Sequence, residues 1–235
     1  DAMFNMDDSK IFTTCQQEPK GMAVIDVEAR KEIKMVPIKG GRAGGMDPQG
    51  KYFMVSASKS VHFFDSQTAE LVKTIKVPGG GGNFTCLKDG SKCYVGLRKA
   101  NAVGVIDMAK LELMKTIETG PDANRLYLNP GNSRYGLFAN EAGKSDIVSI
   151  IDTQLDVKVK DIWTGLGPHN VAFDPDGKFA VISTKKENVA TLVDTGSADP
   201  NDWDVITTDL DSGIQNNGVR WVPSPAALKK ALAQN

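Results

Sequence analysis

Residues 170–183 read NVAFDPDGKFAVIS, which is two apolar runs separated by a short polar segment. Asp, Pro and Gly favour tight turns, whereas Val, Ile and Phe favour strands. The stretch therefore predicts a strand, a turn and a second strand. A turn followed by a basic residue recurs at 8–10, 49–51, 90–92, 132–134 and 176–178, and the basic residues are 41 to 44 positions apart.

A second marker keeps the same period. Short apolar runs end at Asp26, Asp65, Asp107, Asp152 and Asp194, which are 39, 42, 45 and 42 positions apart. Each interval holds four strand-like segments; in the second repeat they are 51–56, 61–65, 71–77 and 83–87. Four antiparallel strands per unit of 40 to 45 residues predict a propeller blade. A sandwich or barrel with accidental regularity is disfavoured, because two independent markers keep one period through five copies.

The repeat also resembles a known family. Residues 170–183 look very like the YVTN repeat, and the resemblance extends over residues 1 to about 223. It implies an all-β β-propeller of four-stranded antiparallel blades, related to cytochrome-d1-like and quinoprotein-dehydrogenase-like propellers. YVTN-like propellers more often have seven blades. The five repeats therefore predict either a five-bladed ring or an arc of a seven- or eight-bladed one, completed by another chain or a missing segment.

The two ends of the sequence bear on ring closure. Residues 2–5 and 218–223 both align with a fourth strand, which is one too many for a neat ring of five. Ser224 and Pro225 are typical of a helix start, and Leu228 and Leu232 lie on one helical face. We therefore predict a propeller domain over 1–223 and a short C-terminal helical tail over 224–235.

Composition excludes several classes of function. The 235 residues are 40% hydrophobic, and 28 Lys and Arg balance 29 Asp and Glu. Such a balance offers no overall attraction for nucleic acid or an anionic membrane, and no run approaches the roughly 18 apolar residues of a membrane span. Cys15, Cys86 and Cys93 form no CxxC motif, and there are two His residues. We therefore predict no disulfide framework, no metal site and buried structural thiols.

Charge sorts the loops into two faces. Loops after the Asp-terminated strands, such as 26–32 and 194–204, are acidic, whereas the loops on the opposite face mix cations with carboxylates. The acidic face could orient a cationic partner, but solvated loops are commonly charged, and that structural interpretation is favoured. The candidate ligand-binding residues on the loop face are Arg42, Lys99, Arg125, His169 and Lys185.

Several other features have a structural interpretation. His169 follows Gly167 and Pro168, a sequence that usually belongs to YVTN repeats, although an imidazole there could ligate haem or a metal. His62 alternates within a strand and is interpreted as a satisfied strand histidine. The five recurring Asp residues are expected to make turn hydrogen bonds. The glycine-rich segments 40–45 and 78–82 open no helix and are predicted to be loops.

No Ser-His-Asp order, HExxH, CxxCH or close carboxylate pair is evident, so we assign no catalytic residue. We predict a non-catalytic scaffold that binds a protein or small ligand through its loop face or central channel, most simply without a cofactor. The resemblance offers a haem- or quinone-dependent oxidoreductase as an alternative, with haem the favoured cofactor. A lactonase-like hydrolase is weaker, resting on residues 138–141. The resemblance implies a periplasmic or extracellular location, whereas unpaired cysteines favour a reducing compartment.

Overall fold

The computed structural model describes residues 2–141, 143, 145–211 and 219, and in these residues twenty strands form five four-stranded antiparallel sheets. The first sheet contains β1 (Ala2–Phe4), β2 (Lys10–Cys15), β3 (Gly21–Asp26) and β4 (Lys31–Pro37). The second contains β5 (Ala43–Met46), β6 (Tyr52–Ser56), β7 (Ser60–Asp65) and β8 (Leu71–Lys76). The third contains β9 (Phe84–Cys86), β10 (Lys92–Leu97), β11 (Ala102–Asp107) and β12 (Glu112–Glu118).

The remaining two sheets repeat the pattern. The fourth contains β13 (Ala123–Leu128), β14 (Tyr135–Asn140), β15 (Ile147–Asp152) and β16 (Val157–Trp163). The fifth contains β17 (Pro168–Phe173), β18 (Phe179–Thr184), β19 (Val189–Asp194) and β20 (Asp204–Asp211). Two 3-10 turns, η1 (Arg98–Ala100) and η2 (Pro200–Asp202), are the helical elements among the described residues. The predicted helical tail over 224–235 lies outside them.

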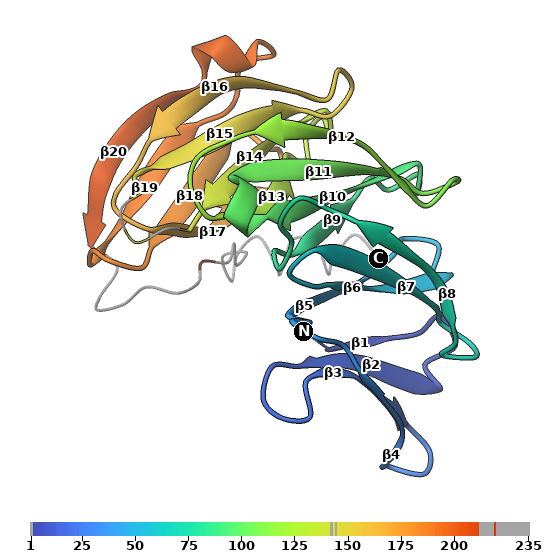
Figure 1. Ribbon diagram of the computed structural model, residues 1–235. Coiled ribbons are helices and arrows are strands. Elements are labelled where there is room, and N and C mark those ends of the chain that lie inside the picture. Colours follow the sequence, from blue (N-terminus) through green and yellow to red (C-terminus); the bar gives the residue numbers. More distant parts are fainter. Residues whose placement is uncertain (1, 142, 144, 212–218, 220–235) are drawn as a thin grey trace, which may run out of the picture.

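The sheets follow one another in an arc, with the first and fifth sheets at its two ends (Figure 1). Within each sheet the strands pair in chain order, and the first strands of consecutive sheets contact each other, β1 with β5 and so on to β17. These first strands therefore form the inner side of the arc. The described residues thus adopt the arc rather than the closed ring of five.

The strand boundaries match the predicted segments, but the grouping of strands differs from the prediction. The segment 83–87, predicted as the fourth strand of its repeat, contains β9, which is the innermost strand of the next sheet. Residues 2–5 likewise contain β1, which pairs with β2 and completes the first sheet. A sequence repeat has no intrinsic starting point, so its period does not show which strands share a sheet. The predicted strand at 218–223 lies outside the described residues, apart from residue 219.

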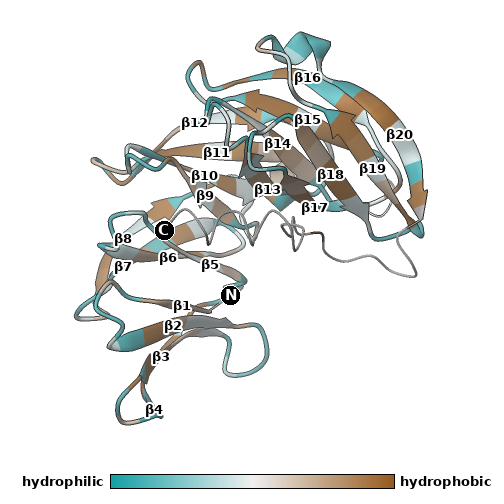
Figure 2. Cartoon of the chain, turned by 180° about the vertical axis from the view of Figure 1, so that it is seen from behind, coloured by the Kyte–Doolittle hydropathy of each residue, from teal (hydrophilic) through white to brown (hydrophobic). Residues whose placement is uncertain are grey.

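Four hydrophobic clusters fill the junctions between consecutive sheets. Phe12 and Phe53 join the first and second sheets, with ring centroids 5.2 Å apart. Tyr135 and Trp203 join the fourth and fifth, with ring centroids 5.9 Å apart. Figure 2 shows apolar residues concentrated on the strands and hydrophilic residues at the connecting loops. Each sheet is therefore stabilised mainly by its immediate neighbours.

The recurring Asp residues make the turn hydrogen bonds that the sequence predicted. Asp65 Oδ1 accepts from the backbone N–H groups of Gln67 and Thr68, at 2.9 and 2.8 Å. The equivalent bonds at the other four turns are those of Asp26 with Ala29, Asp107 with Ala109 and Lys110, Asp152 with Gln154 and Leu155, and Asp194 with Gly196. We call the side of the arc that carries these turns the turn face.

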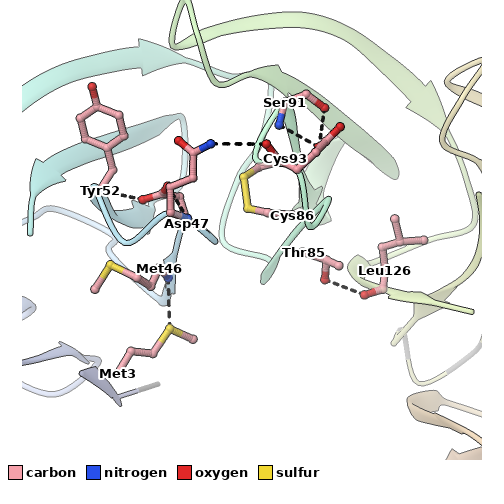
Figure 3. Close-up of a disulfide and its surroundings, with 11 residues drawn as sticks. Met3, Met46, Asp47, Tyr52, Thr85, Cys86, Ser91, Cys93 and Leu126 are labelled. Atoms are coloured by element: carbon pink, nitrogen blue, oxygen red, sulfur yellow. Dashed lines mark hydrogen bonds between the residues drawn. A yellow bond between two sulfur atoms is a disulfide. The ribbon is translucent and has the colours of Figure 1, made fainter. Parts of the chain in front are cut away.

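The cysteines differ from the prediction. Cys86 on β9 and Cys93 on β10 are directly paired in the antiparallel register and form a disulfide (Figure 3). Cys93 is fully buried in the cluster between the second and third sheets, and Cys15 is a free thiol. Sequence reasoning looked for CxxC spacing and missed that residues seven positions apart in the sequence can lie opposite each other across a hairpin. Within the described residues, no helix is long and apolar enough to cross a membrane.

Candidate functional site

The inner ends of the sheets converge on one polar pocket of about 240 Å³. It lies on the side of the arc opposite the turn face, which we call the pocket face, because its loops follow β2, β4, β8, β10, β14 and β18. The lining residues of this inner pocket are Gln16, Arg42, Ala43, Gly81, Asn83, Arg98, Asn124, Glu141, His169 and Lys185. All five sheets contribute to it.

Glycine lets the innermost strands approach closely at this pocket. Gly81 has a φ of +94°, a conformation that residues with a Cβ rarely adopt. A Cβ at Gly82 would lie 2.6 Å from the Gly96 Cα and 2.7 Å from the Asn124 carbonyl oxygen. The segment 78–82 is therefore the predicted loop, and its glycines bring β9 against β13. Across that contact the Asn83 side-chain amide donates to Asn124 Oδ1 at 3.2 Å.

Glu141 is the centre of the charged network in the inner pocket. It follows β14, and its side chain is 9% exposed. Arg98 Nη1 donates to its Oε2 at 2.7 Å, and the Lys185 ammonium donates to its Oε1. His169 Nε2 lies 3.2 Å from the same Oε1. Both carboxylate oxygens are therefore engaged by protein donors.

The network extends from Glu141 to a second carboxylate. Arg98 Nη2 donates to Asp122 Oδ2 at 2.5 Å, so one guanidinium bridges two acids. Burial raises the pKa of Glu141, but the hydrogen bonds from His169, Lys185 and Arg98 outweigh it and hold the pKa far below its ordinary value. Glu141 is therefore ionised at neutral pH. It serves as an anchor for cations rather than as a proton donor.

The structure brings most of the predicted site residues together. Arg42, His169 and Lys185 line the inner pocket, and Arg42 also lines a neighbouring pocket of about 320 Å³ that contains Lys99. Arg125 is absent from both linings. Its guanidinium lies over the Tyr127 ring, 5.4 Å from the centroid, and its buried Nε has no hydrogen-bond partner among the described residues.

Sequence reasoning missed Glu141, Arg98 and Asn124 as site residues. Glu141 entered the sequence analysis as the last residue of the lactonase-like segment 138–141 and among the carboxylates of the pocket-face loops, and Arg98 only among the cations of those loops. One usable signal was position, because Glu141, Arg98 and Lys185 each follow the second strand of a sheet. Equivalent loops of consecutive sheets meet near the inner side of the arc. That juxtaposition becomes visible only once the strands are correctly grouped.

The side chains of the inner pocket do not fit the axial ligation of a haem. The Nε2 atom of His169, the candidate axial ligand, is directed at Glu141. Among the described residues no group of three or more His, Cys, Asp or Glu is placed to hold a metal ion. His62 is a satisfied strand histidine, because its ring nitrogens contact the Ser60 and Thr74 hydroxyls at 2.9 and 3.1 Å.

Comparisons with known proteins identify the fold. No family model matches the chain, and no curated protein matches its sequence. Among solved structures, hydrazine synthase from Kuenenia stuttgartiensis is 24% identical with a TM-score of 0.60, covering 74% of this chain and 52% of that one. A protein of unknown function from Desulfotomaculum acetoxidans is 13% identical with a TM-score of 0.68, covering 88% and 68%.

A third similar structure is a protein named as a 6-phosphogluconolactonase from Bacteroides fragilis. It is 19% identical with a TM-score of 0.71, covering 92% of this chain and 70% of that one. The present chain thus spans about half the length of the hydrazine synthase chain it matches. At these identities the similarity establishes the fold alone. The five four-stranded sheets are those of a β-propeller.

Proposed function

We propose that this chain is a binding protein that holds a small ligand in the inner pocket. The observation that carries the proposal is the convergence of polar side chains from all five sheets on one concave site. Convergent polar groups in a concave pocket can fix the orientation of a bound small molecule. The fixed network around Glu141 supports it as well, because it holds Arg98 and Lys185 in place before any ligand arrives.

Ligand-induced stabilisation tests this function. A library of small metabolites of mixed charge is screened by thermal unfolding of the wild-type protein. A ligand at 100 times its Kd stabilises by about 2.7 kcal/mol, which for a protein of this size raises Tm by about 5–10 °C. The shift should disappear in Lys185→Gln and persist in Lys59→Gln, an exposed cation on the pocket face that lines neither pocket. Hits that survive Lys185→Gln would argue against the inner pocket.

The contact between His169 and Glu141 favours a second candidate function, a lactonase-like hydrolase. A carboxylate can orient an imidazole, which can then accept a proton from water attacking a lactone carbonyl. Ring opening would yield the hydroxy acid. The name of the Bacteroides fragilis protein agrees with such chemistry. Turnover of a sugar lactone by the wild-type protein, lost in His169→Gln, would support this candidate, and equal rates in both would exclude it.

We also propose that the arc is part of a larger ring. On the fifth sheet, Phe179 and Ile206 are 44% and 52% exposed on the face opposite the fourth sheet, and on the first sheet Phe4 is 53% exposed opposite the second. Further propeller sheets would cover these apolar faces. The native particle should then be larger than the 25.3 kDa of this chain. A stable monomer of that mass, measured by light scattering, would contradict this proposal.

The repeats are proposed to be of the YVTN type, in a protein exported to the periplasm or outside the cell. The disulfide between Cys86 and Cys93 supports export, because disulfides persist in oxidising compartments. Thiol labelling of the denatured protein, purified without reductant from its native source, tests the location. One labelled cysteine per chain, Cys15, is expected. Three labelled cysteines would point to a reducing compartment.

A further inference from the structure

In the inner pocket and its neighbour taken together, positively charged side chains outnumber carboxylates. The cations that line the two pockets are Arg42, Arg98, Lys99 and Lys185, and the carboxylates are Asp122 and Glu141. The whole chain has a net charge of −1. The local excess of two positive charges is therefore opposite in sign to the protein as a whole. Low-dielectric walls concentrate such a field inside a cleft.

The carboxylate that lines the inner pocket is already satisfied. Both oxygens of Glu141 accept from Arg98, Lys185 or His169, whereas Asp122 accepts from Arg98 through one oxygen and lines the neighbouring pocket instead. A cationic ligand in the inner pocket would have to displace the partners of Glu141, which is 9% exposed. Separating such a buried ion pair is costly, so Glu141 is a poor receptor for a cation.

The donors, in contrast, are not exhausted. Arg42 is exposed where the two pockets meet, and its side chain pairs with no carboxylate among the described residues. A guanidinium presents a fork of N–H donors that matches a carboxylate or phosphate. The Lys185 ammonium gives one hydrogen bond to Glu141 and, with three N–H groups, has others to offer. These remaining N–H groups of Arg42 and Lys185 can bind a ligand that accepts hydrogen bonds.

The volume of the inner pocket suits a small ligand. A water molecule occupies about 30 Å³ in the liquid, so a pocket of about 240 Å³ corresponds to about eight waters. Building on the proposed binding function, we infer that the ligand of the inner pocket is a small anion with at least one carboxylate or phosphate group. Arg42 binds the anionic group, and the network around Glu141 holds Lys185 and Arg98 beside it.

Calorimetric titration of the full chain with three matched probes tests the charge of the ligand. Succinate, butane-1,4-diol and putrescine share a four-carbon chain and are anionic, neutral and cationic, respectively. Inorganic phosphate is a fourth probe, which distinguishes a site for phosphate from a site for carboxylate. We expect succinate or phosphate to bind and the other two probes not to bind. Because a hydrogen bond between a guanidinium and an anionic group is charge-assisted and stronger than a neutral one, Arg42→Gln should weaken that binding about tenfold or more. Lys59→Gln, a cation on the same face outside both pockets, should leave it unchanged.

The outcomes separate this inference from the binding function itself. Tighter binding of the diol or putrescine than of succinate and phosphate, lost in Lys185→Gln, would overturn the anion and leave a ligand pocket in place. Failure of both anions to bind at millimolar concentration would overturn the inference. The binding function would fail with it only if the metabolite screen also gave no hit sensitive to Lys185→Gln. Anion binding that is equal in Arg42→Gln and the wild type would also overturn it, because the anion would then lie elsewhere.

Discussion

The turn face and the pocket face are built from the same repeat, yet the polar residues are the same from sheet to sheet on the turn face and differ from sheet to sheet on the pocket face. On the turn face every sheet places an Asp at the end of its third strand, and each Asp accepts backbone hydrogen bonds in its own turn. On the pocket face equivalent loops supply Gln16, Arg98, Glu141 and Lys185, four different side chains. A position repeated in every sheet serves local structure; a position that differs in every sheet can build a site.

The largest expected effect breaks the network on the pocket face. Glu141→Gln removes a buried charge that three donors share, and loss of one partner from a buried ion pair costs about 3–5 kcal/mol. We expect the free energy of unfolding in urea to fall by about 3 kcal/mol, the lower end of that range. The loss is limited because Arg98 retains its ion pair with Asp122 and because Lys185 is 31% exposed. A loss below about 1 kcal/mol, the size expected for a turn residue, would show that the two faces do not differ energetically.

The disulfide gives the next effect, and it concerns β9 and β10, which lie next to the pocket residues Asn83 and Arg98. Cys86→Ser opens a loop of eight residues, for which chain entropy predicts a loss of about 2.5 kcal/mol. Reducing agent should destabilise the wild-type protein to the same extent and leave the variant unaffected. Equal sensitivity of both proteins to the reductant would mean that the bond is not formed in solution.

Acid should separate the wild type from the Glu141 variant. The pKa of Glu141 is lowered by folding, so the stability that its ionisation contributes is complete above the ordinary value of 4.5. It is lost as the pH falls below that value, because the unfolded chain takes up the proton first. Urea unfolding between about pH 5 and about pH 3 should show a smaller loss in Glu141→Gln than in the wild type. Parallel pH profiles of the two proteins would contradict the lowered pKa of Glu141.

The smallest effects belong to the turn face. Asp65→Ala and Asp107→Ala each remove two backbone hydrogen bonds, so each should cost about 1 kcal/mol, or about 2–4 °C in Tm. Asp152→Ala should cost more, because Asp152 also accepts from Arg134 at 2.7 Å and is almost fully buried. Similar losses at Asp65 and Asp107 and a larger one at Asp152 would support a local, repeated role for the turn residues. Widely different losses at Asp65 and Asp107 would contradict that role.

Much of the fold could be predicted from the sequence, because the alternation of apolar and polar residues and the turn residues between them indicate where the strands lie. The segment 61–65 matches β7 within one residue, and the Asp turns form as expected. The grouping of strands into sheets could not be predicted, because it depends on pairing between β9 and β10 rather than on the period. The disulfide was missed for the same reason.

The candidate site was only partly predictable. Arg42, His169 and Lys185 were named as separate loop-face residues, and the structure places all three in one pocket. Arg125 has the same chemistry but is packed on Tyr127, which lies two positions along β13 and therefore on the same face of the strand. The alternation of side chains along a strand could have indicated that contact, but it was not used. Glu141 was missed because its importance comes from partners 28 to 44 positions away in the sequence. Long-range convergence of this kind follows from sheet order, which a single sequence does not reveal.

The separate hydrophobic clusters between consecutive sheets make the molecule a one-dimensional array in energetic terms. Each sheet exchanges stabilising contacts with the sheet before it and the sheet after it. The third sheet has neighbours on both sides, whereas the first and fifth have one each among the described residues. Amide hydrogen exchange should therefore be slowest in β10 and β11 and become faster toward both ends of the arc. Opening would then proceed sheet by sheet from the ends, and the pocket, which draws on every sheet, would first lose the lining residues that the first and fifth sheets supply.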